Sequence, residues 1–288
     1  MIDDSSHELL INYDCNVYDK ETKKPLLIFR KNYIPGNYAK QAFDACGKVG
    51  FSLNNRGTAS GKHIGFTKEV ARDKDGNEYK SKTSRVNTQS DAAKEMRRLK
   101  SGSGIVGYFD KTVRTPYCRQ TSFNSHNFDD FKKLYPVIKF VDEAYKELAP
   151  KHYKKQRKVA DETNQDFVIK DTSFTTITVN RNWQTAVHKD KGDFKDGFGN
   201  LVVLRAGDYK GGYFVLPQWK VAVDMQNCDL LLCDVHQWHC NTPIVGDGEN
   251  FRRYSLVMYY REKMIQCGTS EENIEHAKNR KLGESMYA

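Results

Sequence analysis

Two histidines and one aspartate have the residue types and spacing that suit metal chemistry. His188 and Asp190 lie two positions apart, after an alternating β-branched run from Phe174 to Asn180 that predicts a strand. Residues i and i+2 of an extended chain project to one face, so this imidazole and this carboxylate can bind the same ion. A histidine from another strand would complete a set of two nitrogens and one carboxylate, which suits non-haem Fe(II).

The third ligand is predicted to follow the apolar strand that begins at Leu230. Two histidines lie there, and His239 is the better candidate because it opens the segment His-Cys-Asn-Thr-Pro243, where a turn passes into a strand. His236 lies three residues earlier, on the turn. We expect His236 beside the ligands or at the surface.

A further apolar strand, Phe251–Met258, carries two adjacent arginines. Arg253 shares a face with Ser255, whereas Leu256 faces the other way. We therefore expect Arg253 to point inward, and the alternative, Arg252, stays open. A guanidinium binds a carboxylate through two hydrogen bonds, so an inward arginine suits the capture of a cosubstrate carboxylate beside the metal.

The elements that must position these residues are mostly short strands. From Phe167 to Tyr260, apolar runs alternate with Gly, Asn, Asp and Pro turns, which favours a closed or two-sheet β architecture such as a jelly roll. Before them, Phe128–Leu148 carries an apolar stripe at helical spacing, and Pro136 is expected to bend or split that helix. The predicted fold class is therefore mainly β with flanking helices.

Composition along the chain suggests three segments. Residues 1–103 are an N-terminal extension with a basic loop, residues 104–265 form the core with its supporting helices, and residues 266–288 hold a C-terminal helix capped by Ser270. Within the first segment, Asn54 to Lys100 is polar and basic with little periodicity. We expect this stretch to contact phosphates.

The overall charge and the cysteines narrow the setting. A formal net charge of +9 and a pI near 9.0 suggest a polyanionic partner. Seven cysteines without a Cys-x-x-Cys pair argue against a disulfide framework and against a zinc knuckle. With no apparent signal peptide or membrane-spanning run, we expect a monomer in an intracellular setting, nuclear in a eukaryote and in the host cytoplasm if viral.

Four motifs in order resemble the double-stranded β-helix of Fe(II)/2-oxoglutarate dioxygenases: His188-x-Asp, Gly211-Gly-x-Phe, His239-x-x-x-Pro and Arg253-x-Ser. This resemblance spans about Phe167 to Arg261. Two further patterns narrow it. Gly107-Tyr-Phe-Asp with Cys118-Arg-x-Thr, and His188-Lys-Asp-Lys-Gly-Asp, resemble the TET/JBP branch, which oxidises the 5-methyl group of pyrimidine bases in DNA.

The resemblance implies roles for individual residues. His188, Asp190 and His239 would ligate Fe(II), and Arg253 would hold the far carboxylate of 2-oxoglutarate, which reacts with O2. Asn182 would contact this cosubstrate near the metal. The partner that the resemblance implies is double-stranded DNA. A base inside a duplex reaches a buried metal only when it is flipped out, so the substrate would be a flipped 5-methylpyrimidine.

The same resemblance implies three contacts to the flipped base. Asp193 would make a polar contact, Tyr259 would stack on the ring, and Arg261 would meet the base edge, where relatives tend to carry histidine. An ionised Asp193 accepts a hydrogen bond from the cytosine amine and repels the thymine carbonyl, which favours 5-methylcytosine, oxidised to 5-hydroxymethylcytosine or further. The alternatives are a thymine hydroxylase that makes 5-hydroxymethyluracil and a hydroxylase of protein side chains or small molecules.

Overall fold

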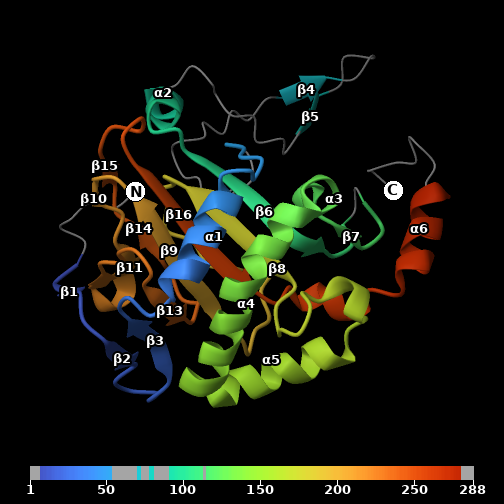
Figure 1. Ribbon diagram of the computed structural model, residues 1–288, viewed down its shortest axis with the longest axis horizontal. Coiled ribbons are helices and arrows are strands. Elements are labelled where there is room, and N and C mark those ends of the chain that lie inside the picture. Colours follow the sequence, from blue (N-terminus) through green and yellow to red (C-terminus); the bar gives the residue numbers. More distant parts are fainter. Residues whose placement is uncertain (1–6, 54–69, 73–77, 81–90, 113–114, 280–288) are drawn as a thin grey trace.

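The structure, a computed structural model, describes residues 7–53, 70–72, 78–80, 91–112 and 115–279 (Figure 1). We expect the basic stretch Asn54–Lys100 to contact phosphates, and most of it lies outside these ranges. Lys82 and Arg85, which belong to this stretch, are among the residues outside them. Among the helices that are described, none is long and apolar enough to cross a membrane.

Eight antiparallel strands form the larger sheet, which carries most of the candidate site. In spatial order they are β2 (Cys15–Tyr18), β3 (Pro25–Arg30), β13 (Leu230–Cys233), β9 (Gly199–Ala206), β16 (Arg252–Tyr259), β8 (Thr176–Arg181), β6 (Gly102–Phe109) and β7 (Arg119–Gln120).

A smaller sheet lies against it and closes the β architecture. Its strands, in spatial order, are β1 (Leu9–Ile11), β12 (Val221–Val223), β11 (Phe214–Leu216) and β14 (Cys240–Asn241); two short pairs add β10 (Lys210–Gly211) with β15 (Ile244–Val245) and β4 (Val70–Arg72) with β5 (Glu78–Lys80). Apolar side chains from both sheets share one buried cluster, in which Val203 of β9 and Leu231 of β13 join Phe214 and Leu216 of β11. The predicted jelly-roll fold class is therefore confirmed.

Helices cover the opposite face of the larger sheet. α1 (Gly36–Cys46) and α4 (Phe128–Leu148) run across it (Figure 1), and their apolar side chains share a second buried cluster with β8, β9, β13 and β16. α4 has the bounds that its apolar stripe predicts, and Pro136 does not split it. The remaining helical elements are α2 (Asp91–Arg98), α3 (Ser122–His126), α5 (Pro150–Glu162), η3 (Gln165–Phe167), η4 (Pro217–Trp219), η5 (Glu262–Gln266) and α6 (Ser270–Lys278).

The described part of the first 103 residues is continuous with the core. β3 pairs with β13 in the larger sheet, β1 pairs in parallel with β12 in the smaller one, and α1 packs beside α4. No local pattern in the sequence indicates these contacts, because the two strand pairings join segments about two hundred residues apart and the helix pair joins segments about a hundred apart. The proposed segment boundaries stay a prediction.

Alternation along β16 turns the candidate residues toward the space between the sheets. Leu256 and Met258 belong to the buried cluster under the helices. Arg253, Ser255 and Val257 line a small pocket on the other face. The strand thus has one apolar face for packing and one functional face, as its sequence predicts.

Candidate active site

His188, Asp190 and His239 meet at one point of this pocket. Their ligand atoms all lie within 4.8 Å of one another. Nε2 of His188 is 3.5 Å from one carboxylate oxygen of Asp190, and Nε2 of His239 is 3.6 Å from the other. Both imidazoles are buried, whereas the Asp190 side chain is 23% exposed, so the group opens to solvent on the aspartate side.

Backbone hydrogen bonds hold the two histidines side by side. His188 and His239 form an antiparallel bridge in which each N–H donates to the other carbonyl at 3.0 Å. The Asp190 N–H donates to the Val235 carbonyl at 3.0 Å. Residues directly opposite in such a bridge project to the same face. The segment forms this bridge without being a regular strand, and the predicted two-residue spacing still turns His188 and Asp190 together.

The hydrogen bonds of both rings suit metal binding. Nδ1 of His188 lies 2.7 Å from the Ala186 carbonyl, and Nδ1 of His239 lies 2.9 Å from the Gln237 carbonyl. A carbonyl oxygen only accepts, so each Nδ1 carries the proton and each Nε2 turns its lone pair toward Asp190. Histidines that bind metal ions in proteins are oriented in this way.

The structure places His236 beside this group, as predicted, and outside the ligand set. Its ring nitrogens lie 3.2 Å from the carbonyls of Asp190 and Phe194. His236 therefore ties the loop after Asp190 to the turn that precedes His239.

Arg253 points into the pocket, which agrees with the predicted facing of β16. Its side chain is buried, one terminal N–H donates to the Gly212 carbonyl at 3.3 Å, and Nε makes no hydrogen bond to the described residues. Arg252 instead donates to the backbone carbonyls of Gly248 and Phe251. A buried guanidinium with an unused donor suits a carboxylate ligand.

The backbone conformation of Gly212 requires glycine at this position of the Gly211-Gly212 pair. Its φ is +72°, and a Cβ there would lie 3.1 Å from Cγ1 of Ile244 and 3.5 Å from Nε of Arg253. A glycine at this position lets the backbone approach the guanidinium closely.

Asn182 does not line this pocket, so its expected role is revised. Its side chain accepts from the Arg253 N–H at 2.8 Å and donates to the Leu99 carbonyl at 2.7 Å, which assigns it to positioning β16. Its φ of +47° ends the alternation of β8, so the i+2 rule no longer applies there. Asn180 lines the pocket instead, with Oδ1 buried and unbonded to the described residues. The sequence offered one signal for this role: Asn180 lies at the end of the alternating strand, on the face that carries Thr176 and Thr178.

The three predicted base contacts lie at the far end of β16. Asp193 and Arg261 face each other in a second antiparallel bridge. Tyr259 lies on the functional face, 7% exposed, with its hydroxyl 3.2 Å from Oγ1 of Thr178. His188, Asp190 and Asp193 therefore lie on one loop, whereas Arg253 and Tyr259 lie on β16 and Arg261 follows that strand.

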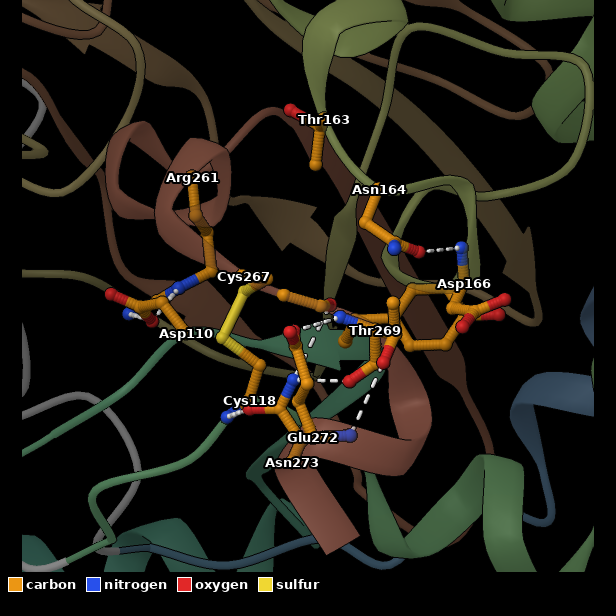
Figure 2. The surroundings of a disulfide bond; sticks show 12 residues. Asp110, Cys118, Thr163, Asn164, Asp166, Arg261, Cys267, Thr269, Glu272 and Asn273 are labelled. Carbon is orange, nitrogen blue, oxygen red and sulfur yellow. Dashed lines mark hydrogen bonds and ion pairs between the residues drawn. A yellow bond between two sulfur atoms is a disulfide. The ribbon is translucent and has the colours of Figure 1, made fainter. Parts of the chain in front are cut away.

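Asp110, the last residue of the Gly107-Tyr-Phe-Asp motif, had no predicted role, and its buried carboxylate holds Arg261. Nε and one terminal nitrogen of Arg261 each lie 2.6 Å from Oδ1 of Asp110, which is 5% exposed (Figure 2). Burial lowers the pKa of Arg261, but Tyr259 and Asp110 outweigh it and the net effect is a raised pKa. The guanidinium therefore stays charged, as a pure hydrogen-bond donor.

A disulfide ties the segment that contains Asp110 to the chain that follows Arg261. Cys118 is bonded to Cys267, and the Cys118 N–H donates to Oδ1 of Asn273 in α6 at 2.7 Å (Figure 2). The expectation of no disulfide therefore needs correction for this pair. The other five cysteines are free: Cys15, Cys46, Cys228, Cys233 and Cys240. The α6 cap is Thr269, not Ser270, in a capping box with Glu272.

Comparison with protein families agrees with this site. The profile of Tet_JBP, the oxygenase domain of the 2OGFeDO superfamily, matches residues 104–262, more than half of the chain. The chain belongs to this family and carries an Fe(II)- and 2-oxoglutarate-dependent oxygenase domain, for which Fe(II), 2-oxoglutarate and O2 are the cofactor and cosubstrates.

Two curated relatives share about a third of their aligned residues with this chain. The bifunctional helicase and thymine dioxygenase JBP2 of Leishmania braziliensis is 36% identical over 180 residues, which cover 62% of this chain and 16% of the relative. The thymine dioxygenase JBP1 of Trypanosoma brucei brucei is 38% identical over 176 residues, covering 59% of this chain and 20% of the relative. The chain thus spans a fifth or less of their lengths.

A solved structure shares the fold. NgTET1 in complex with 5mC DNA superposes with a TM-score of 0.60 and 13% identity, covering 94% of this chain and 86% of that one. The likeness therefore extends beyond the segment that the family profile matches.

Proposed function

We propose that this chain hydroxylates the 5-methyl group of thymine in DNA. In this proposal His188, Asp190 and His239 ligate Fe(II), and Arg253 holds the far carboxylate of 2-oxoglutarate. Bound iron with 2-oxoglutarate and O2 supplies the oxidation of an unactivated methyl, which no side chain performs unaided. The residues of the chain bind and orient both substrates.

One observation carries the proposal: the loop that holds His188 and Asp190 continues to Asp193, which bridges to Arg261 just beyond the strand that holds Arg253. Asp193 lies three residues after Asp190, and its bridge partner Arg261 lies eight residues after Arg253. Residues opposite each other in an antiparallel bridge project to one face, so in this proposal the Asp193 carboxylate offers an acceptor and the Arg261 guanidinium a donor to the same base. Thymine presents the complement, since its N3–H donates and its O4 accepts.

The named relatives favour thymine over 5-methylcytosine. The JBP1 and JBP2 proteins that share 36–38% identity with this chain are named thymine dioxygenases. The sequence-based preference for 5-methylcytosine considers Asp193 alone, and Arg261 adds a donor that suits O4 of thymine. 5-Methylcytosine is the second candidate, because its amine donates and its N3 accepts, so the same pair fits when the two contacts exchange places on the base edge.

The test is mass spectrometry of nucleosides after the reaction. Two duplexes of equal sequence, one unmodified and one with 5-methylcytosine, are incubated with enzyme, Fe(II), 2-oxoglutarate and O2 and digested. We expect 5-hydroxymethyluracil from both duplexes and little 5-hydroxymethylcytosine from the methylated one. The reverse ratio would select 5-methylcytosine.

Asp190→Ala is the matched control, because it removes a ligand from a partly exposed position that contributes little packing. It should keep the fold and lose all iron-dependent product. Iron-dependent 2-oxoglutarate turnover by the wild type without any modified base would point to the remaining alternative, a hydroxylase of protein side chains or small molecules.

A further inference from the structure

Trp238 and Lys189 form an aromatic–cation pair on the outer side of the metal-ligand group. The bridge between His188 and His239 turns both imidazoles inward, and alternation turns the residues beside them outward. Trp238 is 43% exposed, and Nζ of Lys189 lies 5.2 Å from the centroid of its ring. This distance is within the range of a cation–π contact.

Further residues extend this pair into an exposed patch, which we call the Trp238 surface. Val187, Pro217, Gln218 and Trp238 line a shallow groove, and Val187 is 37% exposed. None of these four lining residues is acidic. An exposed apolar patch beside a reactive centre indicates an interaction site more often than an isolated exposed side chain does.

The other two tryptophans of the chain are placed differently. Trp183 is 1% exposed, and Trp219 is half-buried, with its indole N–H donating to Asp19 at 3.2 Å. Trp238 is thus the indole most available to a ligand. This exposed indole lies directly before His239 in the chain, next to the metal-ligand group.

The location of the Trp238 surface points to the substrate strand. Asp190 is the most exposed ligand of the metal group, and Lys189 is its direct neighbour in the chain. Lys191, which follows Asp190, is exposed, and Lys189 is half-buried. Cations beside a flat aromatic ring are the usual combination on surfaces that bind the phosphates and bases of a nucleic acid strand.

We propose that the Trp238 surface binds the DNA strand beside the nucleotide that enters the metal site. The indole stacks on a neighbouring base, and Lys189 neutralises a phosphate of the same strand. Because an indole stacks on any base, this contact adds affinity without sequence preference. The inference rests on the proposed action on DNA.

Tryptophan fluorescence of a Trp219→Phe variant tests the contact directly. In that variant Trp183 is buried and Trp238 is the indole that a quencher reaches. Titration with a duplex oligonucleotide should quench the Trp238 emission by stacking and protect what remains from acrylamide. Anisotropy of a labelled duplex, recorded in parallel, reports binding independently of the tryptophan.

Substitutions at Trp238 test how much the contact contributes. Trp238→Ala should raise the Kd for DNA about tenfold, within the range measured for loss of one base–aromatic stack, and Trp238→Phe should recover most of the affinity because a ring remains. Val245→Ala, which truncates an apolar side chain 63% exposed on β15, is the matched control and should leave the Kd unchanged.

The two measurements separate the inference from the proposed function. If the labelled duplex binds but Trp238 emission and acrylamide access do not change, the Trp238 surface does not face DNA and the inference is wrong, while the proposed function stands. If the labelled duplex does not bind at all, the proposed action on DNA fails, and this inference fails with it.

Discussion

Each imidazole of the metal group donates its Nδ1 proton to the carbonyl two residues before it in the chain. Ala186 serves His188, and Gln237 serves His239. Because the acceptors are backbone atoms, the orientation of both ligands depends on local chain path and not on a particular side chain at either position. Substitution of Gln237 should therefore disturb the metal group less than a change in loop length.

The choice between two adjacent arginines gives a sharp test at a single residue. Arg253→Met should raise the KM for 2-oxoglutarate roughly ten- to a hundredfold, because about 1.5–3 kcal/mol of charged hydrogen bonding is lost. Arg252→Met is the matched control and should leave that KM nearly unchanged, since Arg252 lies on the strand face opposite Arg253 and donates to the backbone carbonyls of Gly248 and Phe251. Equal effects of the two substitutions would contradict the assignment.

Asp110 should act on base recognition through Arg261. Asp110→Asn keeps the shape of the side chain but removes the charge that holds the guanidinium at 2.6 Å. We expect a higher KM for DNA and a changed ratio of 5-hydroxymethyluracil to 5-hydroxymethylcytosine. 2-Oxoglutarate consumption without DNA should not change, because Asp110 does not line the metal pocket. A proportional fall in both reactions would indicate a general loss of folding instead.

At the level of elements, two cross-links join the segment around β7 to the chain that follows β16. The Asp110–Arg261 ion pair is one, and the Cys118–Cys267 disulfide is the other. Phe109 lies between two cations, with the guanidinium carbon of Arg119 4.8 Å and that of Arg261 5.7 Å from its ring centroid. The chain that follows β16, which carries Arg261, is thus attached to the segment around β7.

Removal of the disulfide should lower stability more than activity. The bond closes a loop of 149 residues, and a native disulfide typically contributes about 2–4 kcal/mol to the free energy of unfolding. Cys118→Ala with Cys267→Ala should lower the urea midpoint measured without reductant, and wild type with reductant should match the double variant. Cys15→Ala, at a free half-buried cysteine, is the control. Identical midpoints in all samples would show that the disulfide does not form in solution.

For the whole molecule, the net charge of +9 suits a polyanionic partner. The basic stretch that contains Lys80, Lys82 and Arg85 is expected to contact phosphates. Neutral substitutions at these three positions should reduce the slope of log affinity against log salt by roughly 0.9 for each lost contact. If the slopes measured for wild type and variant coincide, these three residues do not contact phosphates and belong to the solvated surface. The expected intracellular setting also stays a prediction.

Local periodicity in the sequence determined much of this protein. The facing of Arg253, the shared face of His188 and Asp190, and the bounds of α4 all follow from repeats of two or about 3.6 residues, because burial on one side of an element imposes those repeats directly. The order of the short motifs was also enough to indicate the oxygenase family.

Contacts between distant segments were decided only by the tertiary structure. The pairing of β3 with β13, the hold of Asp110 on Arg261 and the Cys118–Cys267 bond each join residues at least 149 positions apart. Asn182, for which only the family resemblance implied a contact with the cosubstrate, lies outside the pocket because its left-handed backbone ends the alternation of β8. Such features depend on which surfaces meet after folding, and a local repeat carries no information about its partner.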